Sequence, residues 1–364
     1  MTERERQILL WITQNPMISQ NELAELAGIT RSSVAVHISN LIKKGYLRGR
    51  GYIVAPPSYV AVIGAVNMDV FGVASHRIVG GSSNEGHVFY KLGGVGRNIA
   101  LNLCRLDVPN YLVTVYGDDY NGELFKSDAV RNGMDITYSR QLTGVGTSTY
   151  LYVNQPDGDR MVGLDDMGIN GNITPDFLEE RRSVVDNADR VVIDSNLSQQ
   201  AIDWVYDNCD RPVFAKSVSV NKARRLLSRP ERLDTLVLDF VEAEVLSGVK
   251  VTDEESARRC ADVLIRRGVR NVCVHGSNKG MLYRNADESV YFPLSGKASS
   301  DRNTNGAGAS AVAALTWARG LGCGFGESGR LAVAAASLTA ESNEAVNPGM
   351  SADLLRERAE RFRS

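Results

Sequence analysis

The sequence predicts a large α/β domain preceded by a small helical domain, and three observations support this expectation. Short apolar runs at 59–66, 191–194 and 272–274 have the length and composition of buried strands. Glycine clusters at 93–96 and 306–308 each open a segment with helical spacing. The first 54 residues contain three short helical patterns. With 364 residues and 43% hydrophobic content, the chain can bury a core in both domains.

Composition and charge exclude several classes of protein. The net charge of −2 gives the chain as a whole no preference for a polyanion. Five scattered cysteines lack metal-ligand spacing and are expected to be free thiols in a reducing cytoplasm. The first residues lack a signal-peptide pattern, and no apolar run approaches the length of a membrane span. A cytoplasmic location is therefore expected.

The first 54 residues carry start signals for three helices and a turn. A first helix is expected over 3–15, with Ile8, Leu9, Leu10 and Ile12 on its apolar stripe. Ser19 and Glu22 have capping-box spacing before a second helix that includes Leu23 and Leu26, and Thr30 can cap a third. The third helix carries Val34, Ile38, Leu41 and Ile42 at helical spacing. Two short segments around 49–51 then predict a hairpin.

These elements together resemble a winged helix-turn-helix domain, which implies binding to double-stranded DNA. Basic residues gather between 30 and 54, where no Asp or Glu occurs. The first turns of the third helix would meet base edges, through Arg31, Ser32, Ser33 and His37. Phosphates would be met by Lys43, Lys44, Arg48 and Arg50. The alternative is a docking module with a solvated basic face. A symmetrical DNA site would require a homodimer.

Two glycine motifs dominate the remainder of the chain. Gly306, Ala307 and Gly308 precede a helix of small residues, so bare N–H groups and the helix dipole can seat an anion there. The alternative is close packing of the helix on a sheet. At 93–96 another glycine cluster opens a helix, but a dinucleotide fingerprint would need a further glycine at the position of Ile99 or beyond. A dinucleotide site is therefore not supported.

The order and wording of the two motifs resemble the ribokinase (phosphofructokinase-B) family, and Gly-Gly-Val-Gly-Arg-Asn-Ile-Ala is most similar to its pseudouridine kinase branch. The resemblance implies a ribokinase-like three-layer sandwich with a small β lid. It divides the chain into a winged helix-turn-helix domain at 1–54, a linker at 55–58 and a kinase-like domain at 59–364. It also implies ATP and Mg²⁺ as cofactors and a sugar or nucleoside as substrate.

The resemblance also assigns residues to the sugar. A carboxylate and an amide beyond a strand suit the hydroxyl groups of a polyol, although capping of the strand end is the alternative. Glycines beside them would let the substrate approach closely. The substrate set implied is Asn67, Asp69, Gly93, Gly94, Asn98 and, in the lid, Thr149.

For the nucleotide, the resemblance implies contacts from Gly276, Asn278 and Asn347. Glu242 matches the family's glutamate that organises Mg²⁺ through water, with Asp239 in place of an asparagine. Glu242 can equally be an ordinary surface charge of its helix. His275 is either a packed strand-end histidine or a ligand contact.

One departure from the family affects the chemistry directly. The family's second motif ends in an aspartate that takes the proton from the substrate hydroxyl, and this chain has Ala309 there. A methyl group cannot accept a proton, and general-base assistance typically contributes about 10²–10⁴ in rate. The family also has Asp-Pro or Asp-Thr where Ala215 and Lys216 stand, which removes a second carboxylate.

Three functions remain compatible with the sequence. The first is a DNA-binding regulator whose kinase-like domain binds a sugar or nucleoside, with or without ATP, and has impaired phosphotransfer. The second is an active ATP-dependent sugar or nucleoside kinase fused to a DNA-binding domain. The third is an interaction scaffold without a ligand, which the polar groups at 67, 69 and 98 argue against.

Overall fold

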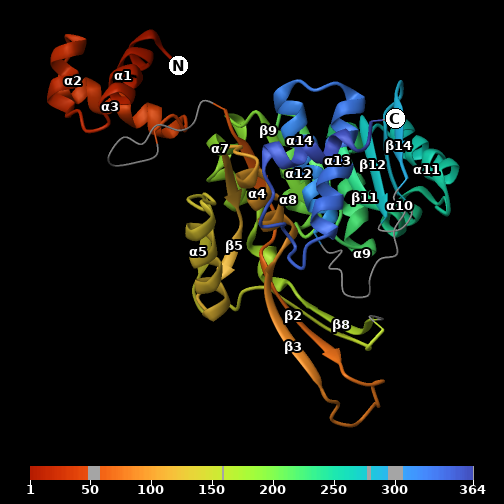
Figure 1. Cartoon of the computed structure of the whole chain (residues 1–364). Helices are drawn as coiled ribbons and strands as arrows, with labels where there is room; N and C mark the ends of the chain where they lie inside the picture. Colours follow the sequence, from red (N-terminus) through yellow and green to blue (C-terminus); the bar gives the residue numbers. More distant parts are fainter. Residues whose placement is uncertain (48–57, 158–159, 277–279, 294–305, 364) are drawn as a thin grey trace.

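The computed structural model describes residues 1–47, 58–157, 160–276, 280–293 and 306–363. Figure 1 shows a small helical domain at the N-terminus, a large body of sheet and helices, and an arm of strands that projects from the body. Residues 55–57 of the predicted linker and most of the predicted hairpin, including Arg48 and Arg50, lie outside the described residues.

The described part of the N-terminal domain, residues 1–47, contains three helices whose boundaries follow their capping residues. Thr2 and Ser19 each form a capping box, and Thr30 accepts a hydrogen bond from the N–H of Ser33. The three helices are α1 (Glu3–Gln14), α2 (Gln20–Ala27) and α3 (Arg31–Lys43). Their core contains Ile8, Ile12, Ile18, Leu23, Val34, Ile38, Leu41 and Leu47.

Three residues assigned to the apolar stripes of these helices do not reach the core. Leu10, Leu26 and Ile42 are 56%, 55% and 41% exposed. Leu10 lies two positions after the buried Ile8, which is about 200° around a helix. The buried stripe is therefore narrower than the sequence pattern predicted.

The body is built on an eight-stranded sheet with the order β14-β13-β12-β11-β10-β9-β1-β4. The six strands from β12 to β4 are parallel, and β13 and β14 extend one edge in antiparallel pairing. The strands are β1 (Val60–Ile63), β4 (Asn110–Val113), β9 (Arg190–Asp194), β10 (Val213–Lys216), β11 (Leu233–Asp239), β12 (Asn271–Gly276), β13 (Gly280–Arg284) and β14 (Ser289–Phe292).

Helices cover both faces of this sheet, which gives the three layers expected. One face packs on α4 (Val95–Arg105), α5 (Tyr120–Asn132), α12 (Ala307–Leu321) and α13 (Phe325–Ala340). The other packs on α6 (Pro175–Glu179), α7 (Arg182–Asp186), α8 (Gln199–Asn208), α10 (Phe240–Ser247) and α11 (Glu254–Arg266). Along each strand the side chains alternate between these two cores. In β10, Val213 and Ala215 join the second core and Phe214 joins the first.

The projecting arm is a four-stranded sheet with the order β3-β2-β7-β8, and it corresponds to the predicted lid (Figure 1). Its strands are β2 (Asn67–Ala74), β3 (Gly86–Gly93), β7 (Thr149–Asn154) and β8 (Arg160–Asp166). Stacked rings of Phe71, Phe89 and Tyr152 line one of its faces. Among the described residues, two ion pairs connect the lid to the body, from Lys222 to Asp165 at 2.7 Å and from Lys91 to Glu344 at 3.2 Å.

The remaining elements connect these layers. They are β5 (Val115–Gly117), β6 (Arg140–Leu142), α9 (Val220–Ala223), α14 (Ala352–Glu360) and the 3₁₀ turns Gly168–Asn172, Arg224–Leu227 and Pro230–Arg232. All five cysteines are free thiols. None of the described helices has the length and apolarity that crossing a membrane requires.

Candidate sugar and phosphate site

Four neighbouring strands end in polar side chains at the same edge of the sheet. Pairing sets Asp194 of β9 beside Lys216 of β10, and Asp239 of β11 beside His275 of β12. Because parallel strands bring their carboxyl ends to one edge, this edge is where an α/β sheet of this type binds ligands.

The buried side chain of Asp194 holds neighbouring backbone segments in place at this edge of the sheet. Its carboxylate is fully buried and accepts hydrogen bonds of 2.9 Å from the backbone N–H groups of Ala65 and Gly96, and of 2.8 Å from that of Asn196. Burial raises the pKa of Asp194, although the three donors oppose this. A Cβ atom at Gly64 would lie 2.4 Å from Oδ2 of Asp194, so glycine is required there. Asp194 thus joins the end of β1 to the start of α4.

Three of the predicted sugar-binding residues lie together at the base of the lid. Asn67 Nδ2 donates to Asp69 Oδ1 at 2.6 Å, and both belong to the first residues of strand β2 rather than to a loop after a strand. A Cβ atom at Gly93 would lie 2.4 Å from Asp69 Oδ2, so the absence of a side chain there makes room for the carboxylate. The cluster presents amide and carboxylate groups suited to hydroxyl ligands.

Asn98 lies in the first turns of α4 and is held by a group that the sequence did not single out. Its Oδ1 accepts a hydrogen bond of 3.0 Å from Arg97, which also pairs with Asp128 at 2.6 Å. Asn98 and Arg97 are both buried. The pair Arg97–Asp128 therefore fixes the orientation of the Asn98 amide and ties α4 to α5.

Thr149 does not share the face of the lid that carries Asp69. Its register partner in β2 is Met68, whereas Asp69 pairs with Tyr150. Since side chains alternate along a strand, Tyr150 rather than Thr149 takes the position beside Asp69. Thr149 instead donates to the carbonyl of Thr147 at 3.3 Å.

The residues of the predicted anion hole, 306–308, lie at the N-terminus of α12. Gly306 is its N-cap, and no side chain of the described residues caps it. A Cβ atom at Gly306 would lie 1.7 Å from the carbonyl oxygen of Ala345, so the close approach of these two segments requires glycine. Ala309 is buried in the apolar core between α12 and the sheet. The position of the expected base thus holds a packed methyl group.

Lys216 and His275 converge on this helix end, and the sequence assigned neither to it. A Cβ atom at Gly308 would lie 2.2 Å from Cε of Lys216 and 2.7 Å from Nε2 of His275. The Lys216 side chain is only 9% exposed, and its Nζ lies 3.2 Å from Glu242 Oε2. Burial, followed by the charge of Lys216, lowers the pKa of His275 to about 3, so its imidazole is neutral. One sequence signal could have placed Lys216 here. It lies two positions after Phe214, so its side chain is on the same face of β10, the face that packs on α12.

Asp239 and Glu242 form a capping box at the start of α10, and Glu242 is buried rather than a surface charge. Glu242 N donates to Asp239 Oδ1 at 2.7 Å, and Asp239 N donates to Glu242 Oε2 at 2.9 Å. Burial, and then the charge of Glu242, raise the pKa of Asp239. The described residues contain no cluster of three or more acidic, His or Cys side chains able to hold a metal. Because Glu242 is already paired with the ammonium group of Lys216, the carboxylates of Asp239 and Glu242 fit Mg²⁺ poorly.

The predicted nucleotide contacts are only partly placed. Gly276 faces Phe240, whose ring atoms would lie 2.0 Å from a Cβ atom, and Asn278 lies outside the described residues. Asn347 donates to the carbonyl of Leu338 at 2.6 Å and accepts from the N–H of Gly349 at 2.9 Å. In this structure Asn347 therefore holds the loop after α13.

The predicted DNA-contacting residues occur along α3 and at its ends. Arg31, Ser32 and Lys43 are exposed, whereas Ser33 and His37 are half-buried. The hydroxyls of Ser32 and Ser33 lie 3.0 and 2.9 Å from the hydroxyl of Thr30, so both take part in the start of the helix. Nδ1 of His37 is buried, which makes His37 less of a surface residue than the sequence suggested.

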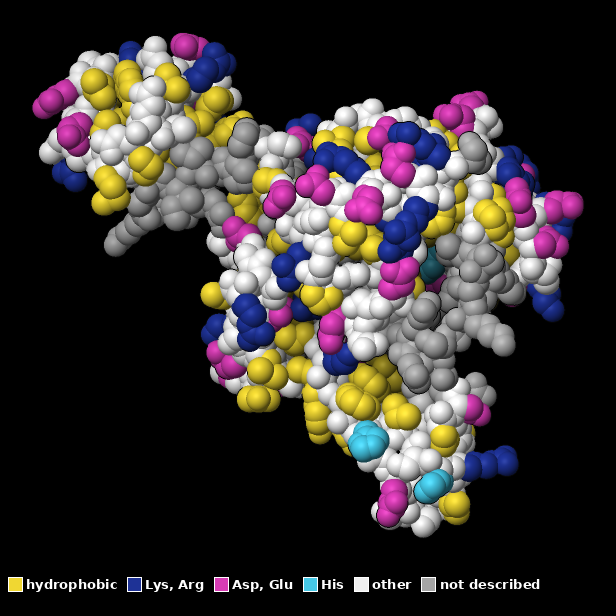
Figure 2. Space-filling view, in the orientation of Figure 1, with side chains coloured by type: hydrophobic (Ala, Val, Ile, Leu, Met, Phe, Trp, Pro, Cys, Tyr) yellow, Lys and Arg dark blue, Asp and Glu magenta, His cyan; other side chains and the backbone are white. Residues whose placement is uncertain are grey.

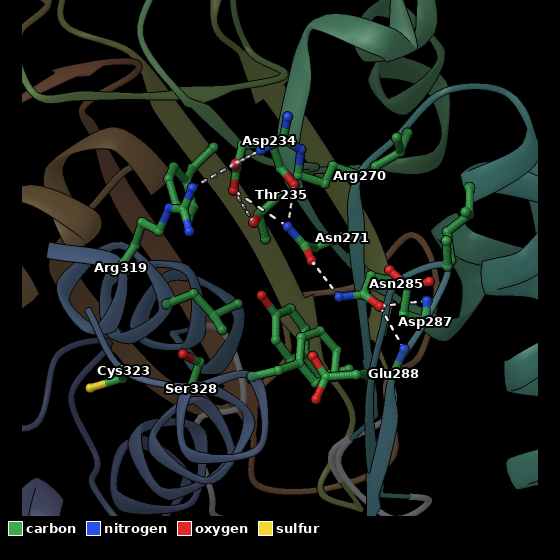
Figure 3. A pocket seen from close by; sticks show the side chains of 17 residues that line it. Asp234, Thr235, Arg270, Asn271, Asn285, Asp287, Glu288, Arg319, Cys323 and Ser328 are labelled. Carbon is green, nitrogen blue, oxygen red and sulfur yellow. Dashed lines mark hydrogen bonds and ion pairs between the residues drawn. The ribbon is translucent and has the colours of Figure 1, made fainter. Parts of the chain in front are cut away.

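A separate cavity of about 600 Å³ opens at the opposite edge of the sheet. It is lined by residues at the amino ends of β11 and β12, and Figure 3 shows Asp234 there between Arg270 and Arg319. The distances of these two ion pairs are 3.6 and 4.0 Å. This cavity is therefore distinct from the cluster around Lys216 and Asp69.

The sheet, the lid over one edge and the glycine-opened helix define a sugar-kinase domain, and the N-terminal helices define a DNA-binding domain. The family profile of pfkB carbohydrate kinases matches residues 57–352, and that of winged helix-turn-helix DNA-binding domains matches residues 1–48. The chain belongs to the pfkB family of carbohydrate kinases. The family and the fold class predicted from the sequence are thus confirmed.

Two proteins of Escherichia coli K12 show how far the similarity extends. An uncharacterized sugar kinase, YeiI, is 34% identical over 354 residues, covering 97% of this chain and 98% of that protein. Pseudouridine kinase is 30% identical over 303 residues, covering 80% of this chain and 94% of that protein. The similarity to YeiI thus extends across both domains of this chain.

Among solved structures, Arabidopsis thaliana ribokinase in complex with ribose and ATP superposes with a TM-score of 0.72 at 22% identity, covering 84% of this chain and 99% of that one. A carbohydrate kinase from Agrobacterium tumefaciens superposes with a TM-score of 0.70 at 24% identity, covering 83% of this chain and 97% of that one. These likenesses show the fold. Kinases of this family use ATP and a divalent metal.

Proposed function

We propose that this protein is a DNA-binding regulator whose kinase domain binds a sugar or nucleoside and has impaired phosphotransfer. The observation that carries the proposal is Ala309, a methyl group buried in an apolar core at the first turn of α12. Glu242, a nearby carboxylate, is engaged by Lys216 and by the N–H of Asp239. A ligand hydroxyl held beside Asp69 would therefore meet no proton acceptor at the usual place.

The test is a turnover assay with the full chain, ATP and Mg²⁺ on a panel of pentoses, hexoses and nucleosides. Binding of the same compounds is measured in parallel by calorimetry. The proposal expects binding of at least one compound with turnover lower by about 10²–10⁴ than an intact general base would give. Fast magnesium-dependent phosphorylation by the unmodified chain would reject it in favour of an active kinase.

An active ATP-dependent kinase is the second candidate, and the similarity to two proteins named as kinases favours it. Phosphoryl transfer depends mainly on positioning and electrostatics, so an anion hole at 306–308 can support residual transfer without the aspartate. In that case ATP and Mg²⁺ are the cofactors, and the same turnover assay identifies the substrate.

For the N-terminal domain we propose double-stranded DNA as the partner, with α3 in the major groove, which places the protein in the cytoplasm. The exposed Arg31 and Ser32 at the start of α3 support this. The test uses a duplex enriched from a random library by the full chain. The double variant R31A/R50A is expected to weaken binding and to lower the salt slope by about 0.9 for each phosphate that is no longer neutralised. R6A, on α1, is the control, and an unchanged slope in R31A/R50A would refute the assignment.

We further propose a homodimer formed through the face of the lid that is opposite Asp69. Five exposed apolar residues share this face by strand register: Val88, Tyr90, Leu151, Val162 and Leu164. Figure 2 shows hydrophobic side chains gathered where the lid leaves the body. L164E is expected to shift the sedimentation coefficient to that of a monomer, whereas V130E on α5, also at an exposed position, should not. Identical sedimentation of wild type and L164E would exclude this interface.

In this proposal the ligand closes the lid over Asn67, Asp69 and Asn98, and closure changes the spacing of the two recognition helices. The ion pairs Lys222–Asp165 and Lys91–Glu344 join lid and body and would carry the movement. The effect on DNA affinity is bounded by the ligand's differential affinity for the two states.

A further inference from the structure

Lys216 places an ammonium group against the N-terminus of α12. The side chain is only 9% exposed and passes over Gly308 with its Cε 2.2 Å from the position of a Cβ atom. An ammonium group has three N–H donors. Lys216 donates two hydrogen bonds, one to Glu242 Oε2 at 3.2 Å and one to the carbonyl oxygen of Ser217. No further acceptor for it occurs among the described residues.

His275 supplies a second unsatisfied group at the same place. Its Nε2 is buried and has no hydrogen-bond partner within the described parts of the chain, and it lies 2.7 Å from the Cβ position of Gly308. The first turn of α12 adds backbone N–H groups that no described side chain caps. Buried polar groups are normally hydrogen-bonded. Nε2 of His275, the third N–H of Lys216 and the uncapped N–H groups of α12 converge with no further acceptor or donor among the described residues, which indicates a ligand.

We propose that this cluster binds a phosphate monoester, so that the effector is a phosphorylated sugar or nucleoside held without a divalent metal. This inference rests on the proposed function and names the chemical class of its ligand. An ammonium group and a helix N-terminus both favour a multiply charged oxyanion, and a neutral imidazole can donate a hydrogen bond to it from the ring nitrogen that carries the proton. A free sugar hydroxyl would use none of the charge of Lys216.

The neighbouring carboxylates are compatible with a bound phosphate. Glu242 is neutralised by Lys216 at 3.2 Å and also accepts from the N–H of Asp239. The pKa of Asp239 is raised by burial and by Glu242, which reduces the repulsion that it exerts on an anion. Ala309 completes the argument, because the aspartate that would repel a finished phosphate ester is replaced by a methyl group.

The experiment is calorimetry on the full chain in EDTA with four probes, namely ribose, ribose 5-phosphate, uridine and uridine 5′-monophosphate. The phosphorylated member of one pair should bind at least about tenfold tighter than its counterpart, and the pair that responds identifies the class of ester. K216Q removes the charge but keeps a donor for Glu242, and it should abolish the preference for the phosphorylated compound. The control is K126M, which removes an exposed lysine on α5.

A second variant keeps the test decisive if K216Q is unstable. G308A places a methyl group against Lys216 and His275 and should also abolish the preference, with the ³¹P resonance of the bound ester as an independent readout. Equal affinity for both members of each pair, or a preference that appears only with Mg²⁺, would overturn the inference and leave the proposed function intact. If none of the four probes binds, with or without ATP and Mg²⁺, both the inference and the proposed function are rejected.

Discussion

The side-chain amide of Asn187 donates a hydrogen bond of 2.6 Å to the backbone carbonyl of Lys44. Lys44 is the C-cap of α3, and Asn187 follows α7 in the kinase domain. The adjacent Gly45 is also close to the kinase domain, since a Cβ atom there would lie 3.0 Å from Nδ2 of Asn187. The end of α3 is therefore held directly by the domain that carries the candidate site.

This contact predicts the effect of N187A on communication between the domains. A neutral hydrogen bond contributes about 0.5–1.5 kcal/mol net, so the variant should reduce the ligand's effect on DNA affinity by a few fold. Binding of the ligand itself should remain unchanged. The measurement is fluorescence anisotropy of labelled duplex with and without the ligand. N172A serves as control because its amide donates only to Ile169 within the kinase domain, at 2.9 Å. Equal coupling in wild type and N187A would show that this contact carries no signal.

Restoring the carboxylate at 309 should increase turnover. A309D is expected to phosphorylate the ligand faster than wild type by about 10²–10⁴, the usual value of a general base. The matched control is A309N, which adds the same bulk to the buried position without a base. Steady-state turnover with ATP and Mg²⁺ distinguishes them. If A309D and A309N have the same rate, the rest of the kinase site is not assembled.

The sequence predicted those parts of the structure that depend on neighbouring residues. Capping by Ser19 and Thr30 and the two glycine-opened helices follow from local spacing. Contacts between elements that are distant in the sequence could not be predicted from local spacing. The approach of Lys216 to Gly308 depends on which face of β10 packs under α12, and which residue of β7 lies beside Asp69 depends on the register of β7 on β2. Asn187 and Lys44 have no sequence signal that links them.

Gly94 is expected to be the most restrictive glycine of the candidate site. Its φ of +97° is unfavourable for other residues, and a Cβ atom would lie 2.4 Å from the carbonyl oxygen of Ala65. Gly133 has a φ of +66° with nothing within 4 Å of a Cβ atom, so it isolates the backbone effect. G133A should cost about 1–2 kcal/mol, and overpacking of backbone should add about 1–3 kcal/mol in G94A. Urea denaturation measures the destabilisation of both variants, and equal values would contradict the close approach of Gly94 to Ala65.

The ion pair between Glu5 and Lys44 predicts how the N-terminal domain responds to acid. The Lys44 ammonium, 2.7 Å from Oε2, and then the N–H of Thr2 hold the pKa of Glu5 below its ordinary value of 4.5. A group whose pKa is lower in the folded state stabilises that state above its unfolded pKa. This contribution should therefore be complete above pH 4.5 and disappear as the pH falls through the folded pKa.

The folded fraction of this domain can be followed by the ¹⁹F resonance of 5-fluorotryptophan at Trp11 in α1, assigned with W11F. Wild type should lose the folded resonance as the pH drops below 4.5, and E5Q should be less stable at pH 7 and less sensitive to acid. E25Q, at an exposed position of α2, should behave as wild type. Because Lys44 also meets Asn187, E5Q should in addition weaken the coupling that N187A tests. An E5Q variant with the acid response of wild type would show that Glu5 is not the group that titrates.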